Sequence, residues 1–218
     1  MSDATGLEVV CIVNGQFAQN CYLVADVETE ECIVVDPGEE SGRILAEVAL
    51  RGWRITAIWL THAHVDHILG VAAVKAAAGA PVHLHPADRS LYEGLPQQAQ
   101  WMGLTAEPAP LPDHALSPGS RLRVGRHEFE VRHTPGHSPG SVSFVGTAVA
   151  LTGDALFAGS VGRTDLPGGD GAALLRSIRR ELLPLPDETV VYSGHGPATT
   201  IGVERTTNPF LTGAYELA

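Results

Sequence analysis

The sequence predicts an α/β fold in which two β-sheets pack face to face and helices cover their outer faces. The chain has 218 residues, enough to bury a sizeable core within one domain. Strand-like and helix-like segments occur in two successive blocks, each β-rich first and helical afterwards, which is typical of layered sheets with helices outside. No internal repeat or linker separates the blocks, so we expect a single domain over residues 1–218.

The first block begins with short runs rich in β-branched residues, which predict strands at 7–13, 21–24, 32–35 and 55–60. A helix is expected from a cap at Ser41 to Gly52, with Ile44 and Val48 on its buried face. The apolar run from Asp66 predicts a second helix over residues 66–78, which Gly79 ends. A turn is expected at Asp36-Pro37-Gly38.

The middle of the chain predicts a short strand at 81–84 and then a long loop over residues 94–118, with room for one short helix. Loops of this length are often functional. Trp101 and Met102 in this loop can pack against the core or touch a substrate, and packing is the more common outcome.

The second block predicts strands at 121–124, 128–133, 141–145, 147–151 and 189–192, with Gly146 at a tight hairpin. Asp170 is expected to cap a helix that buries Leu174 and Ile178 and that Pro184 ends. A short helix is expected over residues 200–208.

Composition argues against several classes of partner. The formal net charge of −11 and the absence of a Lys/Arg run disfavour a nucleic-acid partner. No apolar stretch reaches the ~18 residues of a membrane span. The segment 1–6 is polar and acidic and lacks the features of a secretory signal, so we expect a cytoplasmic protein. Cys11, Cys21 and Cys32 fit no zinc spacing and are expected to be buried, reduced thiols.

The strongest chemical signal is a run of metal-type ligands that follows the strand at 55–60. His62, His64, Asp66 and His67 fall within six residues, and imidazole and carboxylate are usual ligands for zinc and similar ions. Residues two apart in an extended chain point the same way, which groups His62 with His64. The other two would begin the next helix. The spacing therefore predicts a compact cluster suited to two adjacent ions.

Three later segments repeat the pattern of a strand followed by a ligand. His137 lies between two Pro-Gly turns, Asp154 follows Gly153, and His195 lies between two glycines. Glycine lets the backbone bend close to an ion. Ligands just beyond strand ends can converge at one rim of a sheet, so we expect all of these side chains to meet.

This ordered set of ligands resembles the metallo-β-lactamase superfamily over nearly the whole chain, from Val10 to Leu211. The segments 162–169 and 194–202 and the run 208–211 are similar to the bacterial glyoxalase II-like group, hydroxyacylglutathione hydrolases that cleave thioesters such as S-lactoylglutathione. The resemblance implies a four-layer αββα sandwich of two mixed sheets. It also implies two divalent metal ions, most often zinc, with iron or manganese as alternatives.

The resemblance assigns the ligands to two ions and gives Asp66 and Asp154 catalytic roles. One ion would be held by His62, His64 and His137, the other by Asp66, His67 and His195, and Asp154 would bridge both. A water between two cations has a pKa near ~7 instead of ~15.7, so hydroxide can attack a small-molecule thioester. Full-length glyoxalase II adds a C-terminal helical domain for glutathione that this sequence lacks, which leaves the thiol part of the substrate open.

Other functions fit parts of the same pattern. A persulfide dioxygenase would hold a single iron through His62, His137 and Asp154, the facial triad of non-haem iron enzymes. A non-catalytic metal-bearing scaffold is a further alternative, and β-lactam hydrolysis is less favoured because no export signal is present. Arg163 and Asp165 are expected to form an ion pair, with contact to an anionic substrate as the alternative.

The remaining histidines are expected to stay outside the metal centre. The pair His83-x-His85 imitates a ligand motif without a carboxylate neighbour. His114 and His127 are expected at the surface, and His133 is expected to pack within its strand.

Overall fold

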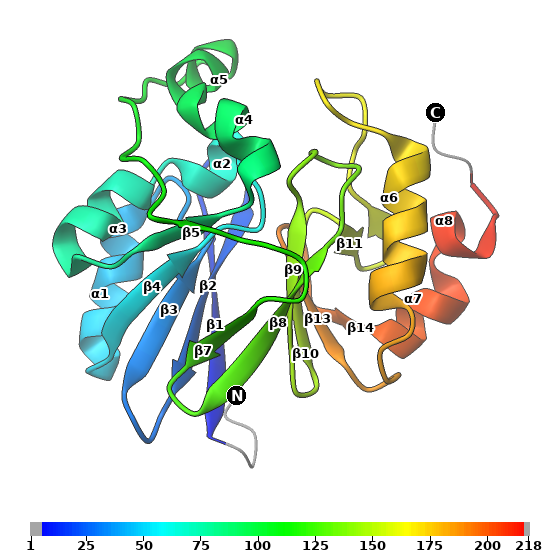
Figure 1. Cartoon of the computed structure of the whole chain (residues 1–218), viewed down its shortest axis with the longest axis horizontal. Coiled ribbons are helices and arrows are strands. Elements are labelled where there is room, and N and C mark those ends of the chain that lie inside the picture. The colour runs from blue at the N-terminus through cyan, green and yellow to red at the C-terminus, as the bar shows by residue number, and fades with distance from the viewer. Residues whose placement is uncertain (1–5, 216–218) are drawn as a thin grey trace.

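The computed structural model describes residues 6–215 and confirms the four-layer arrangement (Figure 1). Two six-stranded sheets face each other, with α1 and α3 outside the first sheet and α6 and α7 outside the second. The prediction that the chain lacks a secretory signal rests on residues 1–6, and residues 1–5 lie outside the described residues. No described helix is long and apolar enough to cross a membrane.

Both sheets are mixed. The first has the order β1-β2-β3-β4-β5-β6, antiparallel between β1, β2 and β3 and parallel from β3 onward. Its strands are β1 Leu7–Asn14, β2 Gln19–Asp26, β3 Glu31–Val35, β4 Arg54–Trp59, β5 Val82–Leu84 and β6 His114–Ala115. The second has the order β14-β13-β10-β9-β8-β7, with β10 and β13 parallel. Its strands are β7 Arg121–Val124, β8 His127–His133, β9 Val142–Gly146, β10 Val149–Gly153, β13 Val190–Ser193 and β14 Thr199–Thr200.

The helical segments lie mostly where the sequence predicts them. They are α1 Ser41–Arg51, α2 Val65–Ile68, α3 Val71–Ala78, η1 Pro86–Asp88, α4 Arg89–Glu93, α5 Leu95–Trp101, α6 Gly171–Ser177, η2 Ile178–Leu182, α7 Ile201–Thr207 and α8 Pro209–Thr212. Asp170 caps α6 by accepting a hydrogen bond from the amide of Ala173 at 2.8 Å. Ser41 is not a cap, because it is the first residue of α1 and the residue before it makes no side-chain cap bond.

The predicted helix over 66–78 is wrong in one respect, because it is two helices. Gly70 interrupts it and donates its amide to Pro37 O at 2.9 Å instead of continuing the helix. A Cβ on Gly70 would also collide with the carbonyl of Gly38. The chain therefore bends where α2 meets the loop that follows β3.

The segment 94–118 contains more structure than a loop. It contributes α5 and the edge strand β6. Trp101, at the end of α5, is 68% exposed, so the expected packing against the core is wrong for this side chain. Met102 is exposed as well, and its carbonyl faces the Gln16 side chain at 3.5 Å.

The β9–β10 hairpin forms as predicted, but Gly146 is not its left-handed residue. Ala148 has the positive φ of 57°. Gly146 is needed for space, because a Cβ there would lie 2.7 Å from a ring carbon of Phe129. The small hairpin of β11 (Leu156–Phe157) and β12 (Ser160–Val161) was not predicted.

Aromatic side chains form the centre of the core between the sheets. Trp59 contacts Phe129 and Phe144, with ring centroids 5.6 and 5.1 Å apart. Cys21 and Cys32 are buried as expected, but Cys11 is exposed because its position on β1 faces outward. The buried core holds the strand ends in place, which positions the loops that follow them.

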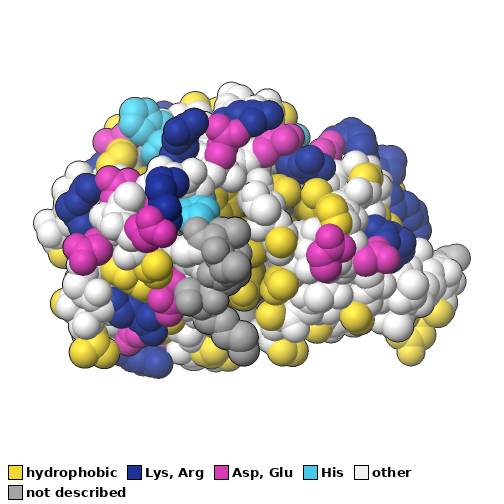
Figure 2. Space-filling model, turned by 90° about the horizontal axis from the view of Figure 1, so that it is seen from below, with side chains coloured by type: hydrophobic (Ala, Val, Ile, Leu, Met, Phe, Trp, Pro, Cys, Tyr) yellow, Lys and Arg dark blue, Asp and Glu magenta, His cyan; other side chains and the backbone are white. Residues whose placement is uncertain are grey.

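The end of the sandwich shown in Figure 2 carries acidic and basic side chains interspersed with apolar ones. Arg126 forms a bidentate contact with Asp26, with nitrogen–oxygen distances of 2.8 and 2.9 Å. His127 is not at the surface as expected: its side chain is 16% exposed, and its Nε2 lies 3.9 Å from Asp26 Oδ1. His114 is exposed, in agreement with the expectation.

Candidate metal centre

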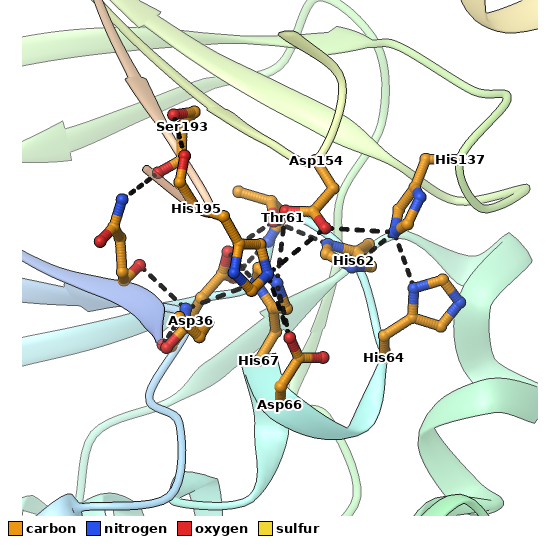
Figure 3. A network of polar contacts seen from close by, with 12 residues as sticks. Asp36, Thr61, His62, His64, Asp66, His67, His137, Asp154, Ser193 and His195 are labelled. Carbon is orange, nitrogen blue, oxygen red and sulfur yellow. Dashed lines mark hydrogen bonds and ion pairs between the residues drawn. The ribbon is translucent and has the colours of Figure 1, made fainter. Parts of the chain in front are cut away.

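All seven predicted ligands lie together at the rim between the two sheets (Figure 3). Each follows a strand end: two lie in the loop after β4, two in α2, and one each after β8, β10 and β13. They are His62, His64, Asp66, His67, His137, Asp154 and His195. The structure thus brings together residues that are 129 positions apart in sequence: His195 Nε2, in the loop after β13, lies 3.1 Å from Asp66 Oδ2 on α2.

The first cluster is made of three imidazoles. His64 Nδ1 lies 2.8 Å from His137 Nε2, and His137 Nε2 lies 3.2 Å from His62 Nε2. The three side chains are buried. Three ring nitrogens therefore face one small volume.

The hydrogen bonds behind these rings assign their protons. His137 Nδ1 lies 2.8 Å from the carbonyl of Arg163, which only accepts, so Nδ1 carries the proton. Thr61 Oγ1 donates to Asp36 Oδ2 at 2.5 Å, so it accepts from His62 Nδ1 at 3.1 Å. The Nε2 atoms of both histidines consequently present lone pairs to the cluster, as a metal ligand must.

The second cluster combines a carboxylate with two imidazoles. Asp66 Oδ2 lies 3.1 Å from His195 Nε2 and 3.6 Å from His67 Nε2. The ring nitrogens that point away from this cluster are also hydrogen-bonded: His195 Nδ1 donates to the carbonyl of Phe17 at 3.1 Å, and His67 Nδ1 donates to Asp36 Oδ2 at 3.0 Å.

Asp154 lies between the two clusters. Its Oδ1 is 3.4 Å from His67 Nε2, and its Oδ2 is 3.5 Å from His137 Nε2 and 3.6 Å from His195 Nε2. One carboxylate therefore faces both ligand groups, which is the position of a bridging ligand.

The donor atoms fit divalent cations. His67 Nε2 and Asp154 Oδ1 are buried and have no hydrogen-bond partner, although buried polar atoms are normally paired. A cation at each cluster would satisfy the converging lone pairs and the unpaired carboxylate oxygen. The set of imidazole and carboxylate ligands suits zinc, iron or manganese.

The protonation states of the first cluster agree with this assignment. Burial lowers the pKa of His64 to about 3, helped by the nearby His137 and His67. Burial likewise holds the pKa of His62 well below its usual value. For Asp154 burial acts in the opposite sense, but the facing His67, His137 and His195 together outweigh it and lower the pKa of the carboxyl group. Neutral imidazoles and an ionised carboxylate are the forms that bind metal. At His67 and His195 burial lowers the pKa, but the facing carboxylates outweigh it and raise the pKa, so a cation there would take the place of protons.

Asp36 is a site residue that the sequence reasoning missed, since it assigned this residue only to a turn. The carboxylate is buried and accepts the Thr61 amide at 2.7 Å in addition to the Thr61 hydroxyl and the His67 ring. Asp36 also lies in a group with His62 and His67, but its oxygens already hold these donors, so it orients ligands. The signal was available, because Asp36 directly follows the buried strand β3.

The loop that carries His195 is held from β2. Asn20 Nδ2 donates to the carbonyls of Ser193 at 2.9 Å and Gly196 at 2.8 Å, and the Tyr22 hydroxyl donates to Ser193 O at 2.6 Å. The first sheet thus fixes the position of a ligand that belongs to the second.

The other singled-out side chains lie apart from the cluster. His83 packs on His114 and His85 stacks on His133, with ring centroids 4.8 and 4.5 Å apart. Arg163 and Asp165 form the expected ion pair, bidentate at 2.7 and 2.8 Å and well exposed.

Comparison with known proteins identifies the family that shares this arrangement. A sequence model described as the Metallo-beta-lactamase superfamily matches residues 14–195. A curated relative from Haemophilus influenzae, named hydroxyacylglutathione hydrolase GloC, is 41% identical over 199 residues, which cover 89% of this chain and 93% of that protein.

Two solved structures are similar over almost the whole chain. One, described as the BLEG-1 B3 metallo-beta-lactamase, is 42% identical with a TM-score of 0.89 and covers 94% of this chain and 100% of its own. The other, described as TTHA1623 in a di-iron-bound form, is 46% identical with a TM-score of 0.85 and covers 93% of this chain and 100% of its own.

Proposed function

This chain belongs to the metallo-beta-lactamase superfamily, and from that premise we propose that it is a binuclear metal-dependent hydrolase of thioesters, with a hydroxyacyl thioester such as S-lactoylglutathione as the substrate class. One observation carries the proposal. Two groups of metal-type ligands flank Asp154, whose buried Oδ1 has no hydrogen-bond partner. A complete and paired ligand set supports two ions rather than one.

The ligands would be divided as their contacts suggest. His62, His64 and His137 would hold one divalent ion, Asp66, His67 and His195 would hold the other, and Asp154 would contact both. When bound, such ions lower the pKa of a water molecule to near ~7 and polarise a carbonyl group. Zinc is the expected metal, and iron is supported by the di-iron form of one similar structure.

The chain's own residues would orient the reactants. Asp66 is the most exposed carboxylate of the centre, with 17% of its side chain accessible, so it can orient a reactant at the open side by accepting a hydrogen bond. Asp154 is more buried, which suits a ligand that fixes the geometry. Both carboxyl groups have a lowered pKa: burial opposes this, but the neighbouring histidines outweigh it.

A thioester suits this centre better than an amide. The far nitrogens of His62, His67, His137 and His195 are all engaged by other groups, which leaves these rings unsuited to protonate a leaving group. A thiol has a pKa of about 8.5, so a thiolate departs with little assistance from an acid. The name of the Haemophilus relative points to the same bond.

Hydrolysis of a β-lactam is a second candidate, favoured by the 42% identity to a protein described as a B3 metallo-beta-lactamase. The leaving group there is an amide nitrogen, which benefits more from a proton donor. The mononuclear iron dioxygenase predicted as an alternative would need only His62, His137 and Asp154, and would leave the second cluster without an ion.

The deciding experiment counts metals per chain by elemental analysis and then compares substrates. We expect about two ions, hydrolysis of S-lactoylglutathione or a related thioester, and much slower cleavage of a chromogenic β-lactam. One iron per chain with oxygen uptake on glutathione persulfide would replace the hydrolase with the dioxygenase. Full metal loading with no cleavage of any thioester would favour the non-catalytic scaffold.

A further inference from the structure

Asp88 is a fully buried carboxylate that joins two ligand-bearing loops from behind. Its Oδ2 accepts hydrogen bonds from the Ala63 amide at 3.1 Å and from the Ser138 hydroxyl at 2.6 Å. Its Oδ1 accepts from the Gly140 amide at 2.6 Å. Ala63 separates His62 from His64, and Ser138 follows His137. A single side chain from η1 therefore holds the backbone beside all three ligands of the first cluster.

Gln98, on α5, holds the opposite side of the same loop. Its Nε2 donates to the carbonyl of Ala63 at 3.0 Å, and its Oε1 accepts from the amide of Val65 at 3.2 Å. A further bond from Nε2 to Leu91 O at 2.7 Å ties Gln98 to α4. Both the amide and the carbonyl of Ala63 are thus bound by buried side chains.

The two loops pack closely around Asp88. A Cβ on Gly140 would lie 2.7 Å from Asp88 Oδ1, so only glycine allows this approach. Ser138 also contacts Ser141, with the two hydroxyl oxygens 2.7 Å apart, which closes the turn after His137. The separation of His64 from His137 is consequently fixed by contacts that involve neither ring.

The second cluster is held by a different set of residues. Asp36 orients His67, and Asn20 and Tyr22 hold the loop of His195. None of these residues bonds to Asp88 or Gln98 among the described contacts. Asp36, through Thr61, and Gln98, through Val65, reach both clusters, whereas Asp88 bonds only to the loops that carry the first cluster.

We infer that Asp88 is a positioning residue for the first metal ion alone, assisted by Gln98, and that it sets the affinity of that ion without touching it. The inference rests on the proposed binuclear site and adds to it a role for the segment between β5 and β6. Partners of this kind typically change metal affinity by about 10- to 100-fold.

The test is Asp88→Asn in the full chain. The Asn side chain keeps the shape of the carboxylate. One of its two terminal atoms is an NH₂ group, which cannot accept the hydrogen bonds that Asp88 accepts at that position. Metal-free protein is titrated with Zn²⁺ against a chromogenic chelator, and with Co²⁺ followed by visible absorption. We expect one ion to bind about 10- to 100-fold more weakly and the other to bind as in the wild type, with a changed Co²⁺ spectrum for the weaker ion.

Two ligand variants identify which ion is affected. In His195→Ala, which retains the first cluster, adding Asp88→Asn should weaken the remaining ion. In His137→Ala, which retains the second, it should change nothing. Ser138→Ala removes one of the three hydrogen bonds and should shift the same ion by a smaller factor, which tests the inference if Asp88→Asn folds poorly.

Asp26→Asn is the matched control, because Asp26 is also fully buried and hydrogen-bonded but lies at the far end of β2. It should bind both ions normally. Normal binding of two ions by Asp88→Asn, or equal weakening of both, would overturn the inference and leave the proposed function intact. A wild-type chain that binds no metal would overturn both.

Discussion

Asp36 Oδ2 lies 3.0 Å from His67 Nδ1, and this contact links the turn after β3 to a ligand of the second cluster. The same oxygen accepts the Thr61 hydroxyl, which in turn accepts the proton of His62. One carboxylate therefore fixes the tautomer of a ligand in each cluster. We therefore expect Asp36 to influence metal binding, although its oxygens are already occupied by these donors.

Replacing Asp36 by Asn should weaken both ions. The amide can accept at only one atom, so either the Thr61 backbone amide loses its acceptor, or the Thr61 hydroxyl and the His67 ring both lose theirs. We expect about a 10- to 100-fold loss of metal affinity, measured by chelator competition. Asp26→Asn again serves as the control, and equal affinities for Asp36→Asn and wild type would refute the orienting role. Asp88→Asn should weaken only one ion, so the two variants distinguish the role of Asp36 from that of Asp88.

Asp154→Ala should remove activity and weaken metal binding together. The carboxylate faces His67, His137 and His195, so its loss affects both ions. Removal of a residue that only hydrogen-bonds to a metal ligand typically lowers metal affinity or activity by about 10- to 100-fold. Removal of a ligand that faces both ions should lower turnover by more than ~100-fold. Rates and metal content measured on the same preparation check this. Full turnover in the variant would contradict the mechanism.

Removal of metal should lower thermal stability as well as activity. Without cations, the ring nitrogens of the first cluster face one another, and two buried polar atoms, His67 Nε2 and Asp154 Oδ1, have no hydrogen-bond partner. An ion present at about 100 times its Kd contributes roughly 2.7 kcal/mol, which corresponds to a fall in Tm on the order of 5–10 °C for a chain of this size. Calorimetry before and after chelation, with readdition of Zn²⁺, measures the change.

The convergence of the seven candidate ligands could be predicted from the sequence, whereas the residues that hold them in place could not. His62, His64, Asp66 and His67 are adjacent in the chain, and their chemistry is visible in the residue types alone. Asp88 and Gln98 acquire their roles only through contacts with residues 25 to 50 positions away, such as Ala63 and Ser138. The break at Gly70 has the same origin, because it depends on the approach of Pro37.

His83 should make the protein less stable in mild acid. Burial and the adjacent His114 lower the pKa of His83 to about 4, against the effect of Asp113. The unfolded chain, with a His pKa of about 6.5, then binds more protons than the folded chain between these values, so stability falls as the pH drops through this window. His83→Gln should lose less stability between pH 7 and pH 4 in urea unfolding. If the stability of both proteins falls equally between pH 7 and pH 4, the prediction is contradicted. Above pH 7 the stability of both should depend on pH in the same way.

Gly194→Ala should disrupt the centre without removing any ligand. A Cβ at this position would lie 2.7 Å from His67 Cε1 and closer still to Asp154 Oδ1. The added methyl group must displace Asp154, His67 or the His195 loop, so we expect loss of at least one ion by elemental analysis. Gly42→Ala is the matched control, because a Cβ there meets nothing within 4 Å on the exposed side of α1. That variant should keep both ions and gain roughly 0.5–1 kcal/mol of stability. Two ions in Gly194→Ala at wild-type affinity would show that the rim can move, and that the geometry in Figure 3 does not limit metal binding.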